Sequence, residues 1–284
     1  MNASNPLVTV YIPTYNRVDL LKRAVESVLQ QTYKNLEVII VDDCSTDGTH
    51  AYLLEIVQKD KRVHYFIKEN NSGACVSRNI AINNAHGEFI TGLDDDDYFL
   101  ESRVQNLINF YYNSGEDFLC TAFLIKNKYN LLKSNGYEGL ITFDMMKNKN
   151  MVDNQIFARK KYFEMMNGFD EKAPAWQDYD LWFRMIENVK PCYRLADYTY
   201  VKDISHEKSR ITMSSKAYQG YLYFIEKHNS KLTKKNMQSL YLIDLINRGQ
   251  KIKISHLLKN FSMTSFLIFL KSNIPNFLKK AIRK

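Results

Sequence analysis

The first hundred residues alternate between short apolar runs and segments in which apolar residues recur at helical spacing. The runs rich in β-branched and aromatic residues predict strands at 8–12, 37–41, 63–67 and 88–91, and the helical spacing predicts helices at 20–29, 49–58 and 74–84. Pro13 is expected to end the first strand, and Asn16 to cap the first helix. Because strands and helices alternate strictly, the sequence predicts an α/β fold with a doubly wound, mostly parallel sheet flanked by helices.

Beyond residue 100 the pattern becomes less regular. It predicts a helix at 102–113, a strand at 118–125, and mixed strands and loops at 126–175. In 215–284 the apolar residues favour helix as far as Pro275, which ends or kinks helical structure. We therefore expect a helical C-terminal extension after the α/β part of the chain.

Polar segments follow three of the predicted strands. They span 13–17, 42–48 and 94–97. In a doubly wound parallel sheet, ligands bind beyond the carboxyl ends of the strands, and those ends share one edge. The three segments are therefore expected to form a single site.

The last of these segments consists of four consecutive carboxylates, Asp94 to Asp97. Like charges on one short turn repel one another and raise one another's pKa values unless a cation neutralises them. A divalent metal that carries an anionic ligand would explain why they are kept, and this indicates phosphate chemistry. The alternative is an acidic turn that simply faces water.

The distribution of charge limits the classes of partner that the chain is expected to bind. The formal net charge is +8, yet 251–284 holds eight of the 39 Lys and Arg residues and no Asp or Glu, so the rest of the chain is neutral. A basic excess confined to one short tail argues against a nucleic-acid-binding groove. Leucines and phenylalanines accompany the lysines of the tail, and this composition favours either contact with an anionic membrane surface or an ordinary helical pair packed on the domain.

Cysteine usage and the termini bear on the compartment. Four cysteines are scattered without a C-x-x-C pair, which suggests neither a zinc site nor a disulfide framework and fits a reducing cytosol. The first residues lack the basic and apolar regions of a secretory signal. The apolar stretch at 266–270 is far shorter than the roughly 20 residues that span a bilayer as a helix. A cytoplasmic protein is expected.

Two further positions suggest ligand contacts. Asp42 and Asp43 end a strand, where a carboxylate can accept hydrogen bonds from a nucleobase or ribose, although Asp43 can equally cap the next helix. Arg78 lies about one turn inside a predicted helix and either forks onto a phosphate or base or covers the helix surface. Two-component receiver domains also place paired acids at a strand end, but a receiver is shorter than this chain and has no place for the second acidic cluster.

Five segments in this order carry a family resemblance. They are Val8-Thr-Val-Tyr-Ile-Pro-Thr-Tyr-Asn-Arg17, Val41-Asp-Asp-Cys-Ser-Thr-Asp-Gly-Thr49, Gly73 to Asn79, Gly87-Glu-Phe-Ile90 and Leu93-Asp-Asp-Asp-Asp97. Together they resemble the family 2 nucleotide-sugar glycosyltransferases of the GT-A fold, over roughly 7–210. The resemblance implies a catalytic domain at 1–214, with a nucleotide-binding half at 1–100 and an acceptor-binding half at 101–214.

The resemblance also implies roles for single residues. The nucleotide-binding candidates are Pro13, Thr14, Tyr15, Asn16, Arg17, Asp43, Arg78, Asp94 and Asp95. Asp94 and Asp96 form the D-x-D element, and both are candidates to hold Mn²⁺ or Mg²⁺ on the donor diphosphate. His206 stands where many relatives carry a histidine that can join the metal, but a histidine on a polar loop can also be inert. The segment 208–210 is expected to close over the diphosphate.

Two later segments extend the match. Asn167-Gly-Phe-Asp-Glu171 resembles the family's G-G-F-D-E stretch, and Trp176 to Arg184 resembles its E-D-x-D-L-W-x-R stretch. By position, Asp178 is the implied catalytic base, and Gln177 replaces the usual acid beside it. The alternative is that Asp178 and Asp180 only cap an amphipathic helix.

These features predict a metal-dependent, inverting glycosyltransferase. It would move a sugar from a nucleotide-sugar donor, expected to be a UDP-sugar, to a glycan or polyprenyl-diphosphate-linked acceptor in bacterial surface-polysaccharide synthesis, such as O-antigen or capsule. The basic C-terminal helices would hold it at the inner face of the cell membrane. Two alternatives are a sugar-1-phosphate nucleotidyltransferase, for which 13–17 lacks a Gly-rich basic loop, and a non-catalytic glycan-binding protein of the same fold.

Overall fold

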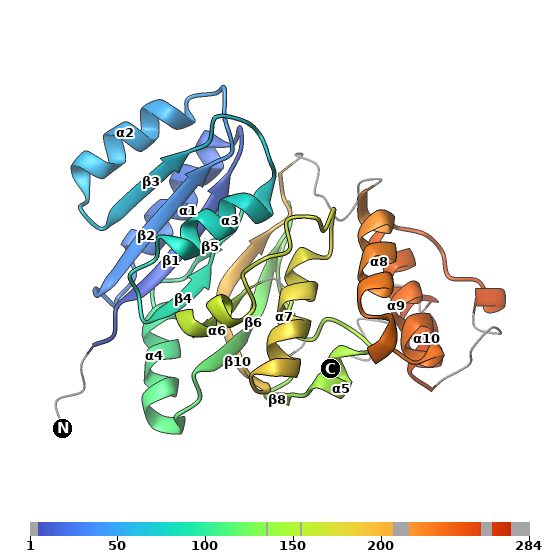
Figure 1. Ribbon diagram of the computed structural model, residues 1–284. Coiled ribbons are helices and arrows are strands. Elements are labelled where there is room, and N and C mark those ends of the chain that lie inside the picture. The colour runs from blue at the N-terminus through green and yellow to red at the C-terminus, as the bar shows by residue number, and fades with distance from the viewer. Residues whose placement is uncertain (1–4, 135, 154, 207–215, 257–262, 274–284) are drawn as a thin grey trace.

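The computed structural model describes residues 5–134, 136–153, 155–206, 216–256 and 263–273 (Figure 1). Within those residues, ten strands form one mixed sheet, and helices cover both of its faces. A group of C-terminal helices lies beside the sheet domain, next to α7 (Gln177–Asn188). None of the described helices is long and apolar enough to span a bilayer.

The N-terminal half alternates as the sequence predicts. Its elements are β1 (Val8–Thr14), α1 (Val18–Leu29), β2 (Leu36–Asp42), α2 (Thr49–Lys59), β3 (Val63–Ile67), α3 (Ala74–Asn83) and β4 (Phe89–Gly92). The strands lie in the order β3-β2-β1-β4, and every neighbouring pair is parallel. Each predicted strand and helix of this half is confirmed, and the carboxyl ends of the strands face one edge of the sheet.

The second half inserts an antiparallel strand into the sheet. Its elements are β5 (Tyr98–Phe99), α4 (Arg103–Ser114), β6 (Phe118–Lys126), β7 (Leu131–Lys133), β8 (Gly139–Ile141), α5 (Phe143–Met146), β9 (Ile156–Arg159), α6 (Lys160–Met165), α7 and β10 (Cys192–Asp203). Strand β9 pairs antiparallel with both β4 and β6, and β6 pairs parallel with β10. The predicted α/β class, with a mostly parallel central sheet flanked by helices, is confirmed. Short strands and helices account for the irregular pattern at 126–175.

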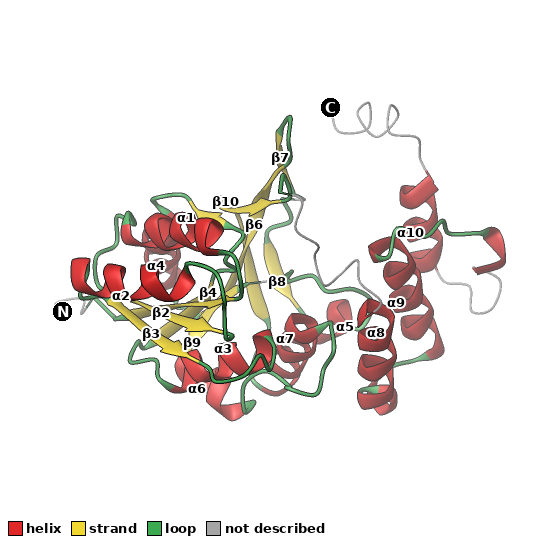
Figure 2. Ribbon diagram, turned by 90° about the horizontal axis from the view of Figure 1, so that it is seen from above, coloured by secondary structure: helices red, strands yellow, loops and turns green. Residues whose placement is uncertain are grey.

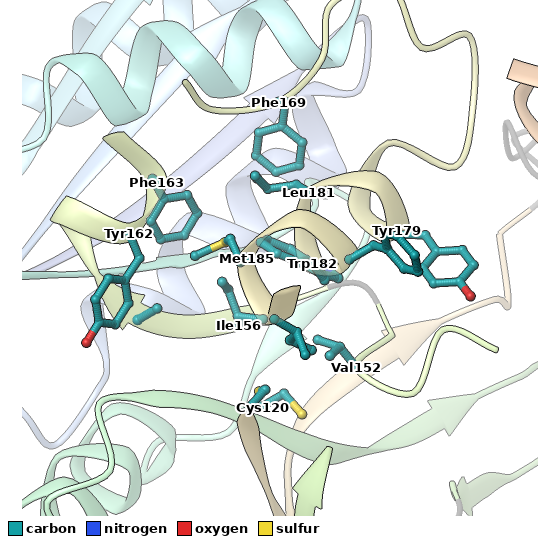
Figure 3. Close-up of a cluster of buried hydrophobic side chains, with 14 of the residues drawn as sticks. Cys120, Val152, Ile156, Tyr162, Phe163, Phe169, Tyr179, Leu181, Trp182 and Met185 are labelled. Atoms are coloured by element: carbon teal, nitrogen blue, oxygen red, sulfur yellow. The ribbon is translucent and has the colours of Figure 1, made fainter. Parts of the chain in front are cut away.

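Alternating residues of the central strands feed two separate cores. Val10 of β1 and Val38 of β2 pack with side chains of α1, α2 and α4 on one face of the sheet. Tyr11 and Ile39, one position further along, pack with side chains of α3, α6 and α7 on the other face (Figure 2). Successive strand residues point to opposite faces, so a strand buried on both sides reads as a continuous apolar run. Trp182 of α7 is buried at the centre of the second core (Figure 3).

Two local expectations are wrong. Strand β1 does not end at Pro13 but continues to Thr14. Its pairing with β4 ends at Tyr11, so the N–H that proline lacks has no partner to bind on the β4 side, and the strand loses no hydrogen bond there. Asn16 does not cap the first helix, which begins at Val18. Its first N–H is bound instead by Asp47 Oδ2, at 3.0 Å, from the next loop.

The predicted C-terminal extension is helical where it is described. It contains α8 (Lys216–Lys227), the 3₁₀ turn η2 (Asn229–Lys231), α9 (Lys234–Asn247), the 3₁₀ turn η3 (Ile254–His256) and α10 (Met263–Asn273). Phe224 of α8 stacks on Tyr179 of α7 with ring centroids 4.5 Å apart, so α8 shares the core of the sheet domain. The expectations for 208–210 and for Pro275, and much of the basic tail, concern segments outside the described residues.

Candidate active site

The strand-end loops at 13–17 and 94–97 are hydrogen-bonded directly to each other. Thr14 Oγ1 donates to Asp95 Oδ2 at 2.9 Å, and Arg17 Nη1 lies 3.0 Å from Asp95 Oδ1 and 3.1 Å from Asp96 Oδ2. Parallel pairing of β1 with β4 brings these two strand ends together. Pro13 precedes Thr14 within β1, and Tyr15, which follows the strand, has 45% of its surface exposed.

The second loop joins the same edge through Asn16. The Asn16 backbone N–H donates to Ser45 Oγ at 2.8 Å, and its side-chain oxygen accepts the Thr46 N–H at 2.7 Å. Asn16 adopts a positive φ of 52°, in the left-handed region that asparagine tolerates better than most residues. The predicted convergence of the three loops is confirmed.

Asp43 is buried and faces the loop that enters α3. Its carboxylate accepts hydrogen bonds from the Ser72 and Gly73 N–H groups, at 2.9 and 2.8 Å, and from Lys68 Nζ at 2.5 Å. The alternative in which Asp43 caps α2 is wrong, because Asp47 Oδ1 accepts the Thr49 N–H at the start of that helix. Asp43 therefore ties the second loop to the Gly73 turn.

The acidic turn brings three carboxylates together. Oxygens of Asp94, Asp96 and Asp97 all lie within 4.8 Å of one another. Asp95, Asp96 and Asp97 are buried, so the alternative of a turn that simply faces water is wrong. Burial raises the pKa of Asp95 to about 6 and that of Asp97 to about 8. Clustered oxygen donors of this kind suit Mg²⁺ or Mn²⁺, and a cation would offset the cost of ionising them.

His206 lies at the same turn. Its Nε2 is 3.3 Å from Asp96 Oδ2, and both ring nitrogens are buried and form no hydrogen bond with the part of the chain that the structure describes. A buried imidazole without hydrogen bonds beside a carboxylate has the chemistry of a metal ligand. The donor set therefore fits a divalent cation, and Asp94, Asp96 and His206 would be among its ligands.

Arg78 connects the acidic turn to α7. Its guanidinium lies 3.0 Å from Asp94 Oδ1 and 3.6 Å from Asp178 Oδ1, and its Nη1 donates to Gln177 Oε1 at 3.3 Å. The side chain is buried and stacks over the Phe169 ring, 5.2 Å from its centroid. The alternative of an arginine that covers the helix surface is therefore wrong.

Asp178 stands in the first turn of α7, beside Arg78. A quarter of its side chain is exposed, while Oδ1 is buried and accepts no hydrogen bond from any described residue. Burial raises the pKa of Asp178 to about 6, although the nearby Arg78 opposes the shift. Trp176 enters the helix at a positive φ of 62°, and such strained backbone is often found at functional sites.

Asp180 contacts a different set of side chains. Its buried carboxylate contacts His228 Nε2 at 2.8 Å, Lys227 Nζ at 2.9 Å and Arg184 Nε at 2.9 Å. Burial alone would raise the pKa of Asp180, but these partners hold it well below its usual range. The two acids of the α7 motif thus have different surroundings. Asp180 is bonded to Arg184 of α7, to Lys227 at the end of α8 and to His228, which follows α8, and not to the N–H groups of its own helix.

Several residues of the site were not assigned from the sequence. Asp97 completes the carboxylate cluster and is held by the Tyr200 hydroxyl at 2.8 Å and the Asp203 N–H at 2.9 Å. Gln155 Nε2 donates to Asp94 Oδ1 at 3.3 Å. Gly92 is required beneath it, because a Cβ there would lie 2.0 Å from Gln155 Oε1. The acidic run and the strand-end position could have indicated Asp97 and Gly92, but no local signal marks Gln155.

Comparison with known proteins agrees with this geometry. Residues 9–172 match the family model described as glycosyl transferase family 2. The chain belongs to this family. Its relatives include the putative colanic acid biosynthesis glycosyl transferase WcaA of Escherichia coli, which is 34% identical over 86% of this chain and 90% of that protein.

A more distant relative and a solved structure extend the comparison. The chain is 27% identical to the GalNAc(5)-diNAcBac-PP-undecaprenol beta-1,3-glucosyltransferase of Campylobacter jejuni, over 78% of this chain and 72% of that one. The S. aureus TarS 1-349 structure in complex with UDP-GlcNAc superimposes with a TM-score of 0.68 at 20% identity, covering 93% of this chain and 79% of that one. At this identity the superposition shows the GT-A fold alone. The chain is thus a glycosyltransferase with relatives in bacterial polysaccharide biosynthesis.

Proposed function

We propose that this glycosyltransferase transfers a sugar, with inversion, from a UDP-sugar to a glycan or lipid-linked acceptor in the synthesis of a bacterial surface polysaccharide. One observation carries the proposal: the Arg78 guanidinium lies between Asp94 of the acidic turn and Asp178 of α7. A candidate metal ligand, Asp94, and a candidate base, Asp178, thus lie beside the same buried guanidinium. The names of the E. coli and C. jejuni relatives support the class of acceptor.

In this proposal the strand-end loops hold the nucleotide. The residues concerned are Pro13, Thr14, Tyr15, Asn16, Arg17, Asp43, Arg78, Asp94 and Asp95. Arg17 and Arg78 place positive charge beside the acidic turn, where a diphosphate would lie. Asp94 and Asp96, with His206, would hold a divalent cation there, and a cation so bound stabilises the negative charge of a departing diphosphate.

Asp178 is proposed as the general base. The acceptor hydroxyl gives its proton to the Asp178 carboxylate as its oxygen forms a bond to the anomeric carbon, and the bond from that carbon to the diphosphate oxygen breaks. The carboxylate suits this role because its buried Oδ1 accepts no hydrogen bond from the described residues and one quarter of the side chain remains open to an incoming alcohol. Attack from the face opposite the diphosphate gives inversion.

The acceptor is proposed to be met at the inner face of the cell membrane. Support comes from the lysines and arginines of 251–284, which have no acidic residue among them. Met263 and Leu267 of α10 expose apolar surface. Such a combination favours an anionic lipid surface. Family membership does not favour the nucleotidyltransferase alternative.

The donor and metal assignments can be tested by thermal unfolding. With Mn²⁺ or Mg²⁺ present, a UDP-sugar is expected to raise the Tm more than GDP- or dTDP-sugars do. A ligand at 100 times its Kd stabilises the native state by about 2.7 kcal/mol, so a donor that binds more tightly gives the larger shift at the same concentration. Asp96→Asn should lose most of this shift. Asp144→Asn, at an exposed carboxylate on α5, is the control and should keep it. An unchanged shift in Asp96→Asn, or one that persists with EDTA, contradicts the metal assignment.

The pH dependence of transfer tests the base. Asp178 has a pKa raised to about 6, so its carboxylate is charged and able to accept a proton above that pH and is protonated below it. The charged groups around it are Arg78, Asp94, Lys202 and Asp153. We expect kcat/KM to fall about tenfold per pH unit below pH 6 and to be level above it. A profile that stays flat down to pH 5, measured where the protein remains folded, argues against this role.

A further inference from the structure

The C-terminal extension contains a pocket that lies outside the strand-end site. It has a volume of about 400 Å³ and is formed by α8, α9 and η3. Two aromatic rings, Tyr221 and Tyr241, line it together with Lys234, Gln238 and His256. A pocket that combines aromatic faces with a few polar groups is typical of a small-molecule site.

Several polar groups of this pocket are left open to a ligand, although the Gln238 amide donates to the His256 carbonyl. The hydroxyls of Tyr221 and Tyr241 and the ammonium of Lys234 have no hydrogen-bond or ion-pair partner among the described residues. Burial raises the pKa of Tyr221 to about 12, so its hydroxyl remains a donor at neutral pH. His256 Nδ1 accepts the Lys253 N–H at 3.2 Å, which leaves Nε2 as the donor nitrogen of the neutral ring.

The charge of the lining indicates the sign of the ligand. Lys234 is exposed on the first turn of α9, and no carboxylate is among the lining residues. The nearby acid of the same helix, Asp244, is buried and paired with Arg248 at 2.6 Å. A hydroxyl-rich ligand with an anionic group therefore fits the pocket better than a neutral or cationic one.

Tyr221 also connects the pocket to the catalytic helix. Its ring lies 5.6 Å from the ring of Trp176, two residues before Asp178, and 6.1 Å from the ring of Tyr241. Gly220 beside it packs so closely that a Cβ would lie 2.7 Å from the carbonyl carbon of Ala175. The segment that enters α7 is therefore held by a wall of the pocket.

We propose that this pocket binds an anionic saccharide unit of the acceptor, remote from the hydroxyl that reacts. Sugar rings present C–H faces that pack on Tyr221 and Tyr241, the tyrosine hydroxyls bind sugar hydroxyls, and Lys234 binds a carboxylate of the saccharide. The assignment to the acceptor rests on the proposed transferase function, whereas binding of the saccharide does not.

The test is a ligand-observed NMR titration of the full chain at low salt, without donor or metal. The probes are a heparosan tetrasaccharide, which alternates glucuronate with N-acetylglucosamine, and chitotetraose as its neutral match. The heparosan tetrasaccharide is expected to bind, and Lys234→Met to weaken it by about 3- to 10-fold, as for loss of one charged hydrogen bond. Lys235→Met is the matched control, because Lys235 is exposed on the same turn of α9 but does not line the pocket.

Equal binding of the two tetrasaccharides, no binding of either, or equal effects of Lys234→Met and Lys235→Met would overturn the proposal. Lys234-dependent binding to anionic phospholipid vesicles, without binding of the tetrasaccharide, would assign the pocket to lipid and overturn it as well. Absence of sugar transfer from every donor, with Lys234-dependent saccharide binding intact, would refute the proposed function and leave the pocket's ligand assigned.

Discussion

Replacing Asp178 with asparagine is expected to reduce sugar transfer by about 10²- to 10⁴-fold, the usual contribution of a general base. The amide keeps the shape of the side chain but cannot accept the proton of the acceptor hydroxyl. Asp178 Oδ1 has no hydrogen-bond donor among the described residues, so the substitution removes no hydrogen bond from that atom. Steady-state transfer assays at saturating donor would measure the loss in kcat.

Two controls separate this effect from damage to the fold. Glu187→Gln, at the other end of α7, removes only an ion pair with Lys231 and should retain activity. Asp178→Asn itself should keep the donor-dependent rise in Tm, because the acidic turn is untouched. If Asp178→Asn transfers sugar at the normal rate, Asp178 is not the base.

Asp180→Asn is expected to destabilise the protein by about 3–5 kcal/mol, the usual cost of removing one partner from a buried charge network. His228, Lys227 and Arg184 all contact this carboxylate. The amide would leave three donors around a neutral group, two of them at the C-terminal end of α8 (Lys227) and directly after it (His228). Because the pKa of Asp180 is lowered by folding, its contribution is present above the ordinary aspartate range and is lost as the pH falls below that range.

Denaturant unfolding of the full chain at pH 7 would measure this loss. Glu187→Gln is again the matched control, since Glu187 and Lys231 also join α7 to the segment after α8 but are more exposed than Asp180 and His228. An ion pair that water reaches contributes about 0–1 kcal/mol. Equal small effects of the two substitutions would show that the Asp180 network does not hold the extension on the catalytic helix.

The strand-end loops show how far a sequence pattern reaches. Three polar segments after three parallel strands must share one edge of the sheet. The bonds from Thr14 and Arg17 to Asp95, and from the Thr46 N–H to the Asn16 side chain, confirm that they do. The sequence pattern gave wrong predictions where contacts with other elements determine the local structure. Pro13 continues its strand because of where β4 ends, and Asp47, not Asn16, binds the first N–H of α1.

The sequence by itself determined the alternation of strands and helices, the edge at which the polar loops meet, and the ordered motifs of family 2, because these depend on local periodicity and on parallel pairing. Only the tertiary structure decided that Arg78 lies between Asp94 and Asp178, that Asp97 joins the carboxylate cluster, and that Asp180 faces His228. Those relations join residues up to 100 positions apart, such as Arg78 and Asp178. The packing of α7 against α3 and α8 sets the places of Asp178 and Asp180, and β10 holds Asp97 through Tyr200 and Asp203. No local pattern carries that packing.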